Sequence, residues 1–423
     1  MRMSKKKEIV PKLRFPEFSK SYWGITRLNA LADKITERNK GDDISRVFTN
    51  SATEGVVDQE EYFDRDIANK NNLTNYFVVE KGDYVYNPRI STTAPVGPIS
   101  KNKLGIGVMS PLYTVFRFRN KENDFYKHFF LTNLWHAYIK NLSNTGARHD
   151  RITISVDNFM KMPLPYASSE EEQKIADCLS SIDELIDAES RKLKALEKYK
   201  KGLMQKLFPA EGKTVPEWRF PEFQDCEEWE TVKLEKLALY RRGSFPQPYG
   251  LPEWYDEKSG MPFIQVFDVD DNMKLKSNTK NKISELAAQQ SVFIPKGTLI
   301  ITIQGSIGRV AITQYDAYID RTLLLFEKFF RRIDKTFLAY NLQLLFDIEK
   351  QKAPGGIIKT ITKQALSEFL TSIPRIEEQE KIAGCLSEVD TIITEQSNKV
   401  EQLKAHKNGL MQGLFPSLEE ADI

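Results

Sequence analysis

One short segment occurs almost unchanged at two places in the chain. Residues 202–209 read GLMQKLFP, and residues 409–416 read GLMQGLFP. The similarity continues toward the amino terminus without a gap, so that residues 174–209 and 381–416 are identical at 19 of 36 positions with a constant offset of 207. A repeat of this length indicates a chain built from repeated structural units, and the offset gives the length of the unit.

A second repeat marks the start of each unit. VPKLRFPEF at 10–18 corresponds to VPEWRFPEF at 215–223 with an offset of 205, and Trp23 corresponds to Trp229 with an offset of 206. The chain of 423 residues is therefore one unit of about 206 residues used twice. Each unit has a short leader with prolines, a long body that differs between the copies, and the closing segment.

The closing segments have the spacing of a helical seam. Apolar residues recur at alternating intervals of four and three, which places them at the a and d positions of a heptad along one side of a long helix. These residues are Ile175, Leu179, Ile182, Ile186, Leu193, Leu196, Leu203 and Leu207 in the first copy, and Ile382, Leu386, Val389, Ile393, Val400, Leu403, Leu410 and Leu414 in the second. Polar residues interrupt the series at the same two places, which are Glu189 and Lys200 in the first copy and Gln396 and Lys407 in the second. Two such helices in one chain predict an antiparallel coiled coil about a pseudo-two-fold axis, with the polar residues fixing the register. The alternative is that each helix packs on its own globular domain.

Signals at the helix ends divide the chain into segments. The acidic residues of EEEQ and EEQE suit the first turn of each helix, where the helix dipole favours negative charge, and Pro209 and Pro416 end the helices. The predicted segments are a basic leader (1–19), a first body (20–168), a central helix (169–209), a linker with the second leader (210–224), a second body (225–375), a C-terminal helix (376–416) and an acidic tail (417–423). Segment 1–14 has six Lys and Arg against one Glu, and 417–423 has three acids and no base, so both are expected to be solvated tails.

Both bodies combine β and α patterns. Short β-rich runs lie at 75–87, 110–118, 291–303 and 321–330, and amphipathic helical runs lie at 124–140 and 335–350. Lys81-Gly82 corresponds to Lys296-Gly297, and VGPI in the first body corresponds to IGRV in the second. The predicted fold class is therefore α+β, with two mixed α/β domains that share a frame, separated by the two long helices in an internal repeat.

Composition limits the class of protein. The hydrophobic content of 40% and the charged content of 28% are typical of a soluble globular protein, and no apolar run approaches the ~18 residues of a membrane span. The basic start is not followed by the apolar core of a secretory signal. Cys178, Cys226 and Cys385 are far apart and predict neither a disulfide framework nor a zinc site, so a cytoplasmic location is expected. With a net charge of +2, any nucleic-acid face must be a local patch.

Familiar catalytic motifs are missing from the sequence. PGGIIKT at 354–360 lacks the spacing of a Walker A loop, and no G-x-S-x-G nucleophile elbow occurs. YNPRI at 86–90 lacks the second proline and the aromatic residue of the Asn-Pro-Pro-aromatic motif of amino-methyltransferases. The four histidines are His128, His136, His149 and His406. They have no metal-ligand spacing, and the first two are expected to be structural. The sequence favours a recognition or scaffold protein without a catalytic site of its own.

Polar loops in both bodies are candidates for nucleic-acid contacts. In the first body the candidate residues are Tyr86, Asn87, Arg89, Thr145, Gly146, Arg148, His149 and Arg151, and in the second they are Gln304, Ser306, Arg309, Gly355, Gly356, Lys359, Thr360 and Thr362. Arg can bridge O6 and N7 of guanine, Asn and Gln can pair with adenine, and Thr and backbone N–H groups can hold phosphate. For a single residue, a surface turn with solvated charges is the alternative. Clusters at equivalent places of two bodies favour a shared binding function.

The repeated architecture resembles the specificity subunit of type I restriction-modification enzymes. The resemblance rests on RFPEF at 14–18 and 219–223, EEEQKIADCLSSID at 170–183, EEQEKIAGCLSEVD at 377–390, and GLMQKLFP with its second copy. It covers the whole chain in the order body, helix, body, helix. The duplicated helix motifs are fairly specific, whereas the body motifs are weak because the bodies of this family vary with the DNA that they read.

The resemblance implies two target-recognition domains, each reading one half of a bipartite site in double-stranded DNA. It also implies that the helices set the spacing and dock two modification (methyltransferase) subunits, while two restriction (motor-nuclease) subunits complete the complex. Adenine methylation and restriction would use S-adenosylmethionine, ATP and Mg²⁺ on the partner subunits, with no cofactor or metal bound by this chain and no membrane partner. Two alternatives stay open. One is a coiled-coil scaffold with two ligand-binding domains and no DNA role, and the other is a fused restriction-modification enzyme acting alone, against which the missing motifs argue.

Overall fold

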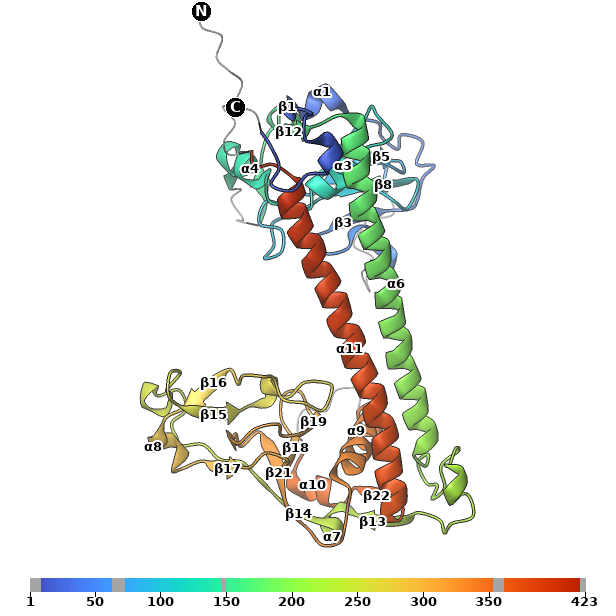
Figure 1. Cartoon of the computed structure of the whole chain (residues 1–423), viewed down its shortest axis with the longest axis vertical. Helices are drawn as coiled ribbons and strands as arrows, with labels where there is room; N and C mark the ends of the chain where they lie inside the picture. Colours follow the sequence, from blue (N-terminus) through green and yellow to red (C-terminus); the bar gives the residue numbers. More distant parts are fainter. Residues whose placement is uncertain (1–8, 63–72, 146–149, 353–360, 419–423) are drawn as a thin grey trace, which may run out of the picture. The chain divides into compact units, whose positions relative to one another are not determined.

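The chain forms two compact units, each of which combines one body with half of each long helix (Figure 1). The computed structural model describes residues 9–62, 73–145, 150–352 and 361–418. The first unit contains the residues up to 189 and those from 399 onward, and the second unit contains residues 190–398. The compact units therefore do not follow the linear order of body, helix, body and helix.

The first unit is built on a four-stranded antiparallel sheet in the order β2-β9-β6-β7. Its strands are β1 (Gly24–Arg27), β2 (Ala32–Lys34), β3 (Phe48–Ser51), β4 (Gly55–Asp58), β5 (Phe77–Val79), β6 (Tyr84–Tyr86), β7 (Ile99–Lys101), β8 (Gly107–Met109), β9 (Thr114–Phe118), β10 (Asn144–Thr145), β11 (Ile152–Thr153) and β12 (Pro163–Tyr166). Its shorter helices are η1 (Pro16–Phe18), α1 (Leu28–Leu31), α2 (Gln59–Tyr62), α3 (Asp124–Phe129), α4 (His136–Leu142) and α5 (Val156–Met160).

The second unit contains a sheet of the same form in the order β14-β21-β18-β19, and a second four-stranded sheet in the order β16-β15-β20-β17. Its strands are β13 (Glu230–Lys233), β14 (Ala238–Arg242), β15 (Met261–Ile264), β16 (Asn281–Ile283), β17 (Val292–Ile294), β18 (Leu299–Thr302), β19 (Val310–Ile312), β20 (Ala317–Ile319), β21 (Leu323–Phe329) and β22 (Leu370–Ile373). Its shorter helices are η2 (Pro221–Phe223), α7 (Leu234–Leu237), η3 (Pro252–Trp254), η4 (Val266–Asp268), α8 (Glu285–Ala288), α9 (Lys335–Lys352) and α10 (Lys363–Ser367). The long helices are α6 (Ser169–Leu207) and α11 (Ile376–Leu414).

The two bodies repeat one frame. The strands β6 and β18 hold the same position in their sheets, and the pair β1–β12 is repeated as the pair β13–β22. Every residue of β6 and β18 is buried, which explains why these strands are apolar or aromatic at all positions but Thr302 and show no alternation with polar residues. The α+β fold class predicted from the sequence is confirmed.

The helical run predicted at 124–140 is wrong as a single helix, because the chain turns between α3 and α4. The hydroxyl of Thr132 donates to the carbonyl of Phe129 at 2.7 Å, which competes with helical hydrogen bonding. The buried indole of Trp135 donates to the carbonyl of Phe130 at 3.2 Å and fixes the turn. Trp135, which the sequence places on a helix face, therefore stabilises the turn that separates α3 from α4.

Ion pairs between the two long helices show that they are antiparallel. In the first unit Lys407 Nζ lies 2.5 Å from Asp183 Oδ1, and Lys399 Nζ lies 2.5 Å from Glu189 Oε1. From the first pair to the second, the residue number on α6 rises from 183 to 189, while that on α11 falls from 407 to 399. Only antiparallel helices allow this order. All predicted seam residues are buried or half-buried. The polar positions Lys407 and Glu189 thus take part in the pairing of the helices.

One polar side chain from each body reaches the helix pair. In the second unit Lys200 Nζ lies 2.6 Å from Asp390 Oδ1, and the hydroxyl of Tyr340 on α9 donates to the other oxygen of Asp390 at 2.6 Å. In the first unit His128 on α3 has the corresponding place, and its Nε2 lies 3.1 Å from the hydroxyl of Ser180 on α6. Each body is therefore joined to the helix pair by a hydrogen bond beside a cross-helix ion pair.

Each of the repeated GLMQ-x-LFP segments packs against the body of the other repeat. Phe415, at the end of the second copy, packs in the core of the first unit with ring centroids 5.0 Å from Phe125 and 5.8 Å from Phe129. Phe208, at the end of the first copy, packs in the core of the second unit 5.3 Å from Phe337. The segment occurs twice because each body needs one, and each receives it from the other repeat.

The RFPEF leader forms a partly buried ion pair with the first turn of the long helix. Arg14 Nε and Nη2 each lie 2.8 Å from one carboxylate oxygen of Glu171, and the indole of Trp23 donates to the same carboxylate at 3.1 Å. This bond with Glu171 raises the pKa of Arg14 above its usual value. The second unit repeats this leader clamp with Arg219, Trp229 and Glu378.

The same leaders also contact the ends of the long helices. The backbone N–H of Leu13 donates to the carbonyl of Gly413 at 2.8 Å, and that of Trp218 donates to the carbonyl of Lys206 at 3.0 Å. A Cβ on Gly413 would lie 2.4 Å from the side chain of Leu13, whereas position 206 carries a lysine. The close approach of Leu13 is therefore found at the one position where GLMQKLFP and GLMQGLFP differ.

The expectation that both chain ends are solvated tails is wrong for several described residues. Ile9 is buried and bridges to Trp23, and Arg14 belongs to the leader clamp. Leu418 is buried in the core of the first unit. Apolar burial and the partly buried ion pair hold these segments although their net charge is high.

Candidate nucleic-acid interface

The loop after β6 holds the first group of predicted contacts. Tyr86 is buried, stacks on Phe159 and donates its hydroxyl hydrogen to the carbonyl of Val96 at 2.9 Å. Burial raises the pKa of this hydroxyl well above its usual range. Tyr86 is therefore a core residue, which corrects the expectation that its side chain lies on a contact loop.

Asn87 shapes this loop from within. Its side-chain amide donates to the carbonyl of Asn50 at 2.9 Å, and its side-chain oxygen accepts from the backbone N–H of Arg89 at 3.0 Å. Gly97, at a φ of +80°, passes so close that a Cβ there would lie 2.0 Å from the carbonyl oxygen of Asn87. Only glycine combines a positive φ with such a close approach to a carbonyl oxygen. The loop that contains Gly97 therefore packs directly against the backbone of Asn87. The side chain of Arg89 remains exposed.

The predicted contact residues after β6 and those before β11 lie side by side, although they are more than 60 positions apart in the chain. The backbone N–H of Ile152 donates to the carbonyl of Pro88 at 2.9 Å, and that of Ile90 donates to the carbonyl of Asp150 at 3.0 Å. Arg89 and Arg151 are thus directly opposite each other in an antiparallel bridge. The segment of Arg151 continues into β11, which pairs with β10, where Thr145 is opposite Ile152.

The second body brings together the equivalent segments. The backbone N–H of Ile361 donates to the carbonyl of Ile303 at 3.2 Å, as Ile152 does to Pro88 in the first body. Gln304 follows Ile303 as Arg89 follows Pro88, and the side chain of Gln304 is half-buried. The same pair of loops therefore meets in both units, with different residues at the meeting point.

Two predicted residues of the second body are engaged within the protein. Arg309 forms a two-pronged ion pair with Asp271, with distances of 2.8 and 3.2 Å, and it also donates to the carbonyl of Val269 at 3.1 Å. The hydroxyl of Thr362 caps α10 by accepting from the backbone N–H of Ala365 at 3.0 Å. These contacts argue against direct base contacts by either side chain, whereas Ser306 is exposed.

Several predicted residues lie outside the described part of the chain. They are Gly146, Arg148 and His149 in the first body and Gly355, Gly356, Lys359 and Thr360 in the second. Their proposed DNA contacts stay predictions.

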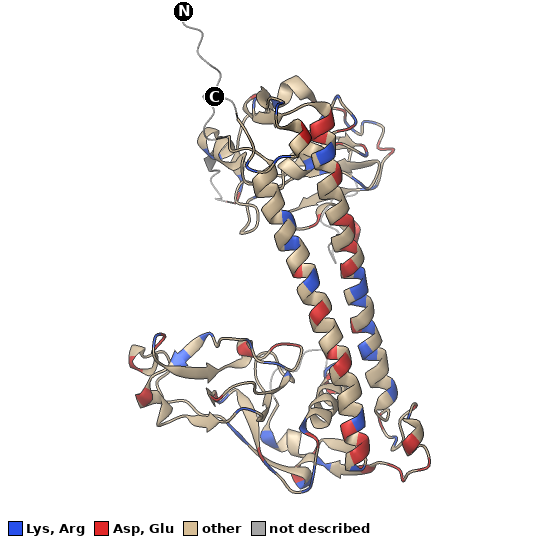
Figure 2. Cartoon of the chain, viewed as in Figure 1, with Lys and Arg blue, Asp and Glu red and all other residues tan. Residues whose placement is uncertain are grey.

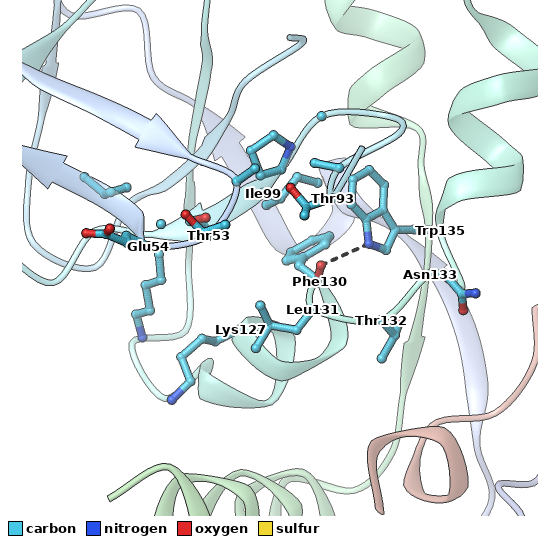
Figure 3. A pocket seen from close by; sticks show the side chains of 18 of the residues that line it. Thr53, Glu54, Thr93, Ile99, Lys127, Phe130, Leu131, Thr132, Asn133 and Trp135 are labelled. Atoms are coloured by element: carbon cyan, nitrogen blue, oxygen red, sulfur yellow. Dashed lines mark hydrogen bonds between the residues drawn. The ribbon is translucent and has the colours of Figure 1, made fainter. Parts of the chain in front are cut away.

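A hollow of about 430 Å³ lies in the first unit between the β3–β4 turn, the loop before β7 and the turn after α3 (Figure 3). Its wall includes Phe130 and Trp135, which are joined by the indole hydrogen bond. Two of its lysines are ion-paired, Lys101 with Asp124 and Lys407 with Asp183, both at 2.5 Å. Paired charges around an apolar wall do not make a distinct anion site, so we place the candidate interface at the paired loops.

Charges of both signs are interspersed over both units, in agreement with the small net charge (Figure 2). Within the described ranges, no group of three or more His, Cys, Asp or Glu residues could hold a metal ion. No described helix is both long enough and apolar enough to cross a membrane.

The two described histidines of the first body are embedded in it. His128 is fully buried, and burial, followed by the charges of Lys127 and Lys407, lowers its pKa to about 3. Burial also lowers the pKa of His136, which packs edge-on against Trp135. Their packing supports the expected structural role.

Comparison with known proteins gives the family. The chain matches the model for the type I restriction modification DNA specificity domain at residues 32–198 and again at 226–404. It is 26% identical over 329 residues to the type I restriction enzyme MjaVIII specificity subunit of Methanocaldococcus jannaschii, covering 73% of each chain. Its fold resembles the crystal structure of the S subunit of a type I restriction-modification system from M. genitalium, with a TM-score of 0.58 and 14% identity over 97% of this chain and 100% of that chain.

A second structure, from work on complex assembly and conformational transition of the type I R-M system, gives a TM-score of 0.57 at 17% identity, covering 93% of this chain and 96% of that chain. The two family matches together span most of the chain and coincide with the two repeats. The resemblance drawn from the repeated motifs is confirmed. The chain belongs to the family of type I restriction-modification DNA specificity domains and carries that domain twice.

Proposed function

We propose that this chain is the DNA-recognition subunit of a type I restriction-modification complex, in which each unit reads one half of a bipartite site. The observation that carries the proposal is that the same two loops are hydrogen-bonded to each other in both units. Ile152 bonds to Pro88 in one unit and Ile361 to Ile303 in the other, while the adjoining side chains, Arg89 and Gln304, differ. A repeated frame with divergent exposed residues suits two readers of different sequences.

The paired helices have a separate role in this proposal. They set the distance between the half-sites and dock two modification subunits, and two restriction subunits complete the complex. S-adenosylmethionine, ATP and Mg²⁺ belong to these partners, and the chain itself has no catalytic role. Adenine methylation and restriction both depend on its recognition of the site.

Co-expression of the chain with its methyltransferase subunit, followed by methylome sequencing, tests the proposal. The expected result is one bipartite methylated motif that disappears when the chain is omitted. Binding of the purified complex to duplex DNA should weaken steeply as salt is raised. A coiled-coil scaffold without a DNA role would give neither result, and methylation by the isolated chain would support the fused enzyme instead.

A further inference from the structure

Arg89 and Arg151 form an unusual pair, because two positive side chains are directly opposite each other. The bonds from Ile90 to Asp150 and from Ile152 to Pro88 flank the pair on both sides. In an antiparallel ladder this arrangement defines a non-hydrogen-bonded pair, in which the side chains are closest, with Cβ atoms about 4.5–5.5 Å apart.

Both arginines face away from the core. Ile152, the next residue after Arg151, packs against the core of the first unit. Successive side chains of an extended segment point to opposite faces, so Arg151 and its partner Arg89 point outward. Arg89 is exposed, and the side chain of Arg151 retains 43% of its accessible surface.

Nothing among the described residues neutralises the pair effectively. The one ion pair is between Arg151 Nε and Asp150 Oδ2 at the long distance of 3.9 Å, and Arg89 has no ion pair in the described part of the chain. Two other exposed arginines of this unit are ion-paired at short distance, Arg46 with Asp58 at 2.8 Å and Arg119 with Asp33 at 2.6 Å. Like charges directly opposite each other destabilise a ladder, so this pair fits an external partner rich in acceptors.

We propose that Arg89, with Arg151 beside it, determines specificity by reading a guanine in the first half-site, and that Gln304 reads an adenine from the equivalent place in the second unit. The inference rests on the proposed function and names the bases read. The guanidinium fork matches O6 and N7 of guanine, and the glutamine amide matches N6 and N7 of adenine. The side chain of Gln304 is half-buried beside the exposed Ser306, whereas the nearby Arg309 is held by Asp271.

The test uses the full chain in complex with its methyltransferase subunits and a library of duplexes with randomised half-sites. Arg89→Ala should weaken binding to the preferred site by about 5- to 150-fold and relax one position of the first half-site, where guanine is required. Arg89→Gln should change that position toward adenine. The second half-site should stay unchanged in both variants. Gln304→Ala should relax one adenine position of the second half-site only.

Two controls separate base reading from general electrostatics. Arg89→Lys keeps the charge but replaces the planar fork with a point charge, so it should keep the salt dependence and weaken the preference for guanine at that position. Arg119→Ala removes one positive charge from the same unit and should leave the motif unchanged. A uniform loss over all sequences, with full rescue by lysine, would mean a phosphate contact and would overturn the inference.

Unchanged binding and an unchanged motif in Arg89→Ala would overturn it as well. Because the wild-type complex is measured in parallel, its own failure to select a site would instead count against the proposed function. Unfolding of Arg89→Ala should occur at a temperature no lower than that of the wild type, since the change removes a like-charge contact. A large fall would identify a structural role and contradict the inference.

Discussion

Arg219 and Glu378 are 159 positions apart in the chain, yet their side chains form a two-pronged ion pair that is almost fully buried, with distances of 2.8 and 2.7 Å. The guanidinium also donates to the backbone carbonyls of Cys226 and Glu227. The indole of Trp229 donates to the same carboxylate at 3.2 Å. The pair fastens the leader of the second unit to the first turn of α11.

Removing one partner of this pair should loosen the second unit. Glu378→Gln leaves the buried Arg219 without a counter-charge, at an expected cost of about 3–5 kcal/mol in the stability of that unit. Hydrogen exchange resolved by segment is the measurement, since a chain of two units need not unfold in one step. Faster exchange should be confined to β13, β22 and the adjoining half of α11.

Glu171→Gln is the matched variant for the first unit, where it should expose β1 and β12 instead. Replacing both partners of the second pair with apolar residues, as in Arg219→Met with Glu378→Leu, should recover only part of the loss, because the indole N–H of Trp229 and the carbonyls of Cys226 and Glu227 also lose their partners. Equal exchange in Glu378→Gln and the wild type would mean that the clamp does not stabilise the unit.

The end of each long helix packs in the unit of the other repeat, which gives a prediction that does not follow from the linear order of the chain. Phe415→Ala should destabilise the first unit, whose α3 contacts Phe415, by about 3–5 kcal/mol. Phe208→Ala should destabilise the second unit through α9 by a similar amount. Hydrogen exchange of α3 and α9 distinguishes the two variants. An effect of Phe415→Ala on α9 rather than on α3 would contradict the exchange.

Low pH should weaken the first unit through His128. Burial lowers the pKa of His128 to about 3, whereas an unfolded histidine titrates near 6.5, so only the unfolded chain takes up this proton in between. The stability is fully present above pH 6.5 and is lost as the pH falls toward 3, by about 2 kcal/mol at pH 5.

Urea unfolding at pH 7 and pH 5 is the measurement, with His128→Gln as the control. Glutamine keeps a hydrogen-bonding group near Ser180 and does not titrate. The difference in stability between the two pH values should therefore be smaller in the variant. An equal difference in both proteins would assign the pH dependence to other groups.

The paired helices should act as a ruler between the half-sites. Four residues add about 6 Å to a helix, and DNA rises 3.4 Å per base pair, so the unspecific gap should grow by about one or two base pairs. Because Lys407–Asp183 and Lys200–Asp390 lie on either side of the middle, insertions belong in both helices, after Ser190 and after Asn398. Methylome sequencing reads the gap directly.

A matched seven-residue insertion keeps the heptad phase and controls for register, because four residues shift the seam. The half-sites should be the same in all variants, since the contact loops are not changed. An active four-residue variant with an unchanged gap would leave the helices as docking surfaces only.

The long helices could be predicted from the sequence because their signal is repeated and periodic. Seam residues such as Leu179 and Leu386 recur over more than thirty positions, and helical periodicity is most reliable over that length. The exchange of helix ends could not be predicted. GLMQKLFP and GLMQGLFP are nearly identical, so neither sequence says which body it enters, and the contact between Leu13 and Gly413 is visible only in three dimensions.

The candidate interface was harder to predict because exposure and pairing depend on tertiary contacts. Tyr86 lies in a strand that is buried on both faces, and Arg309 is held by Asp271 from 38 positions away. No local pattern contains either fact. The pairing of Arg89 with Arg151 was equally hidden, although both were identified singly by their place in polar loops.

The most direct measurement of the central claim is the methylated motif of a complex in which residues 20–168 come from another member of the family. The replacement must keep the aromatic residues of α3 that receive Phe415, or the first unit will not close. If each unit reads one half-site, methylome sequencing will show one half of the motif replaced and the other half and the gap unchanged. A change in both halves of the motif would contradict two independent readers.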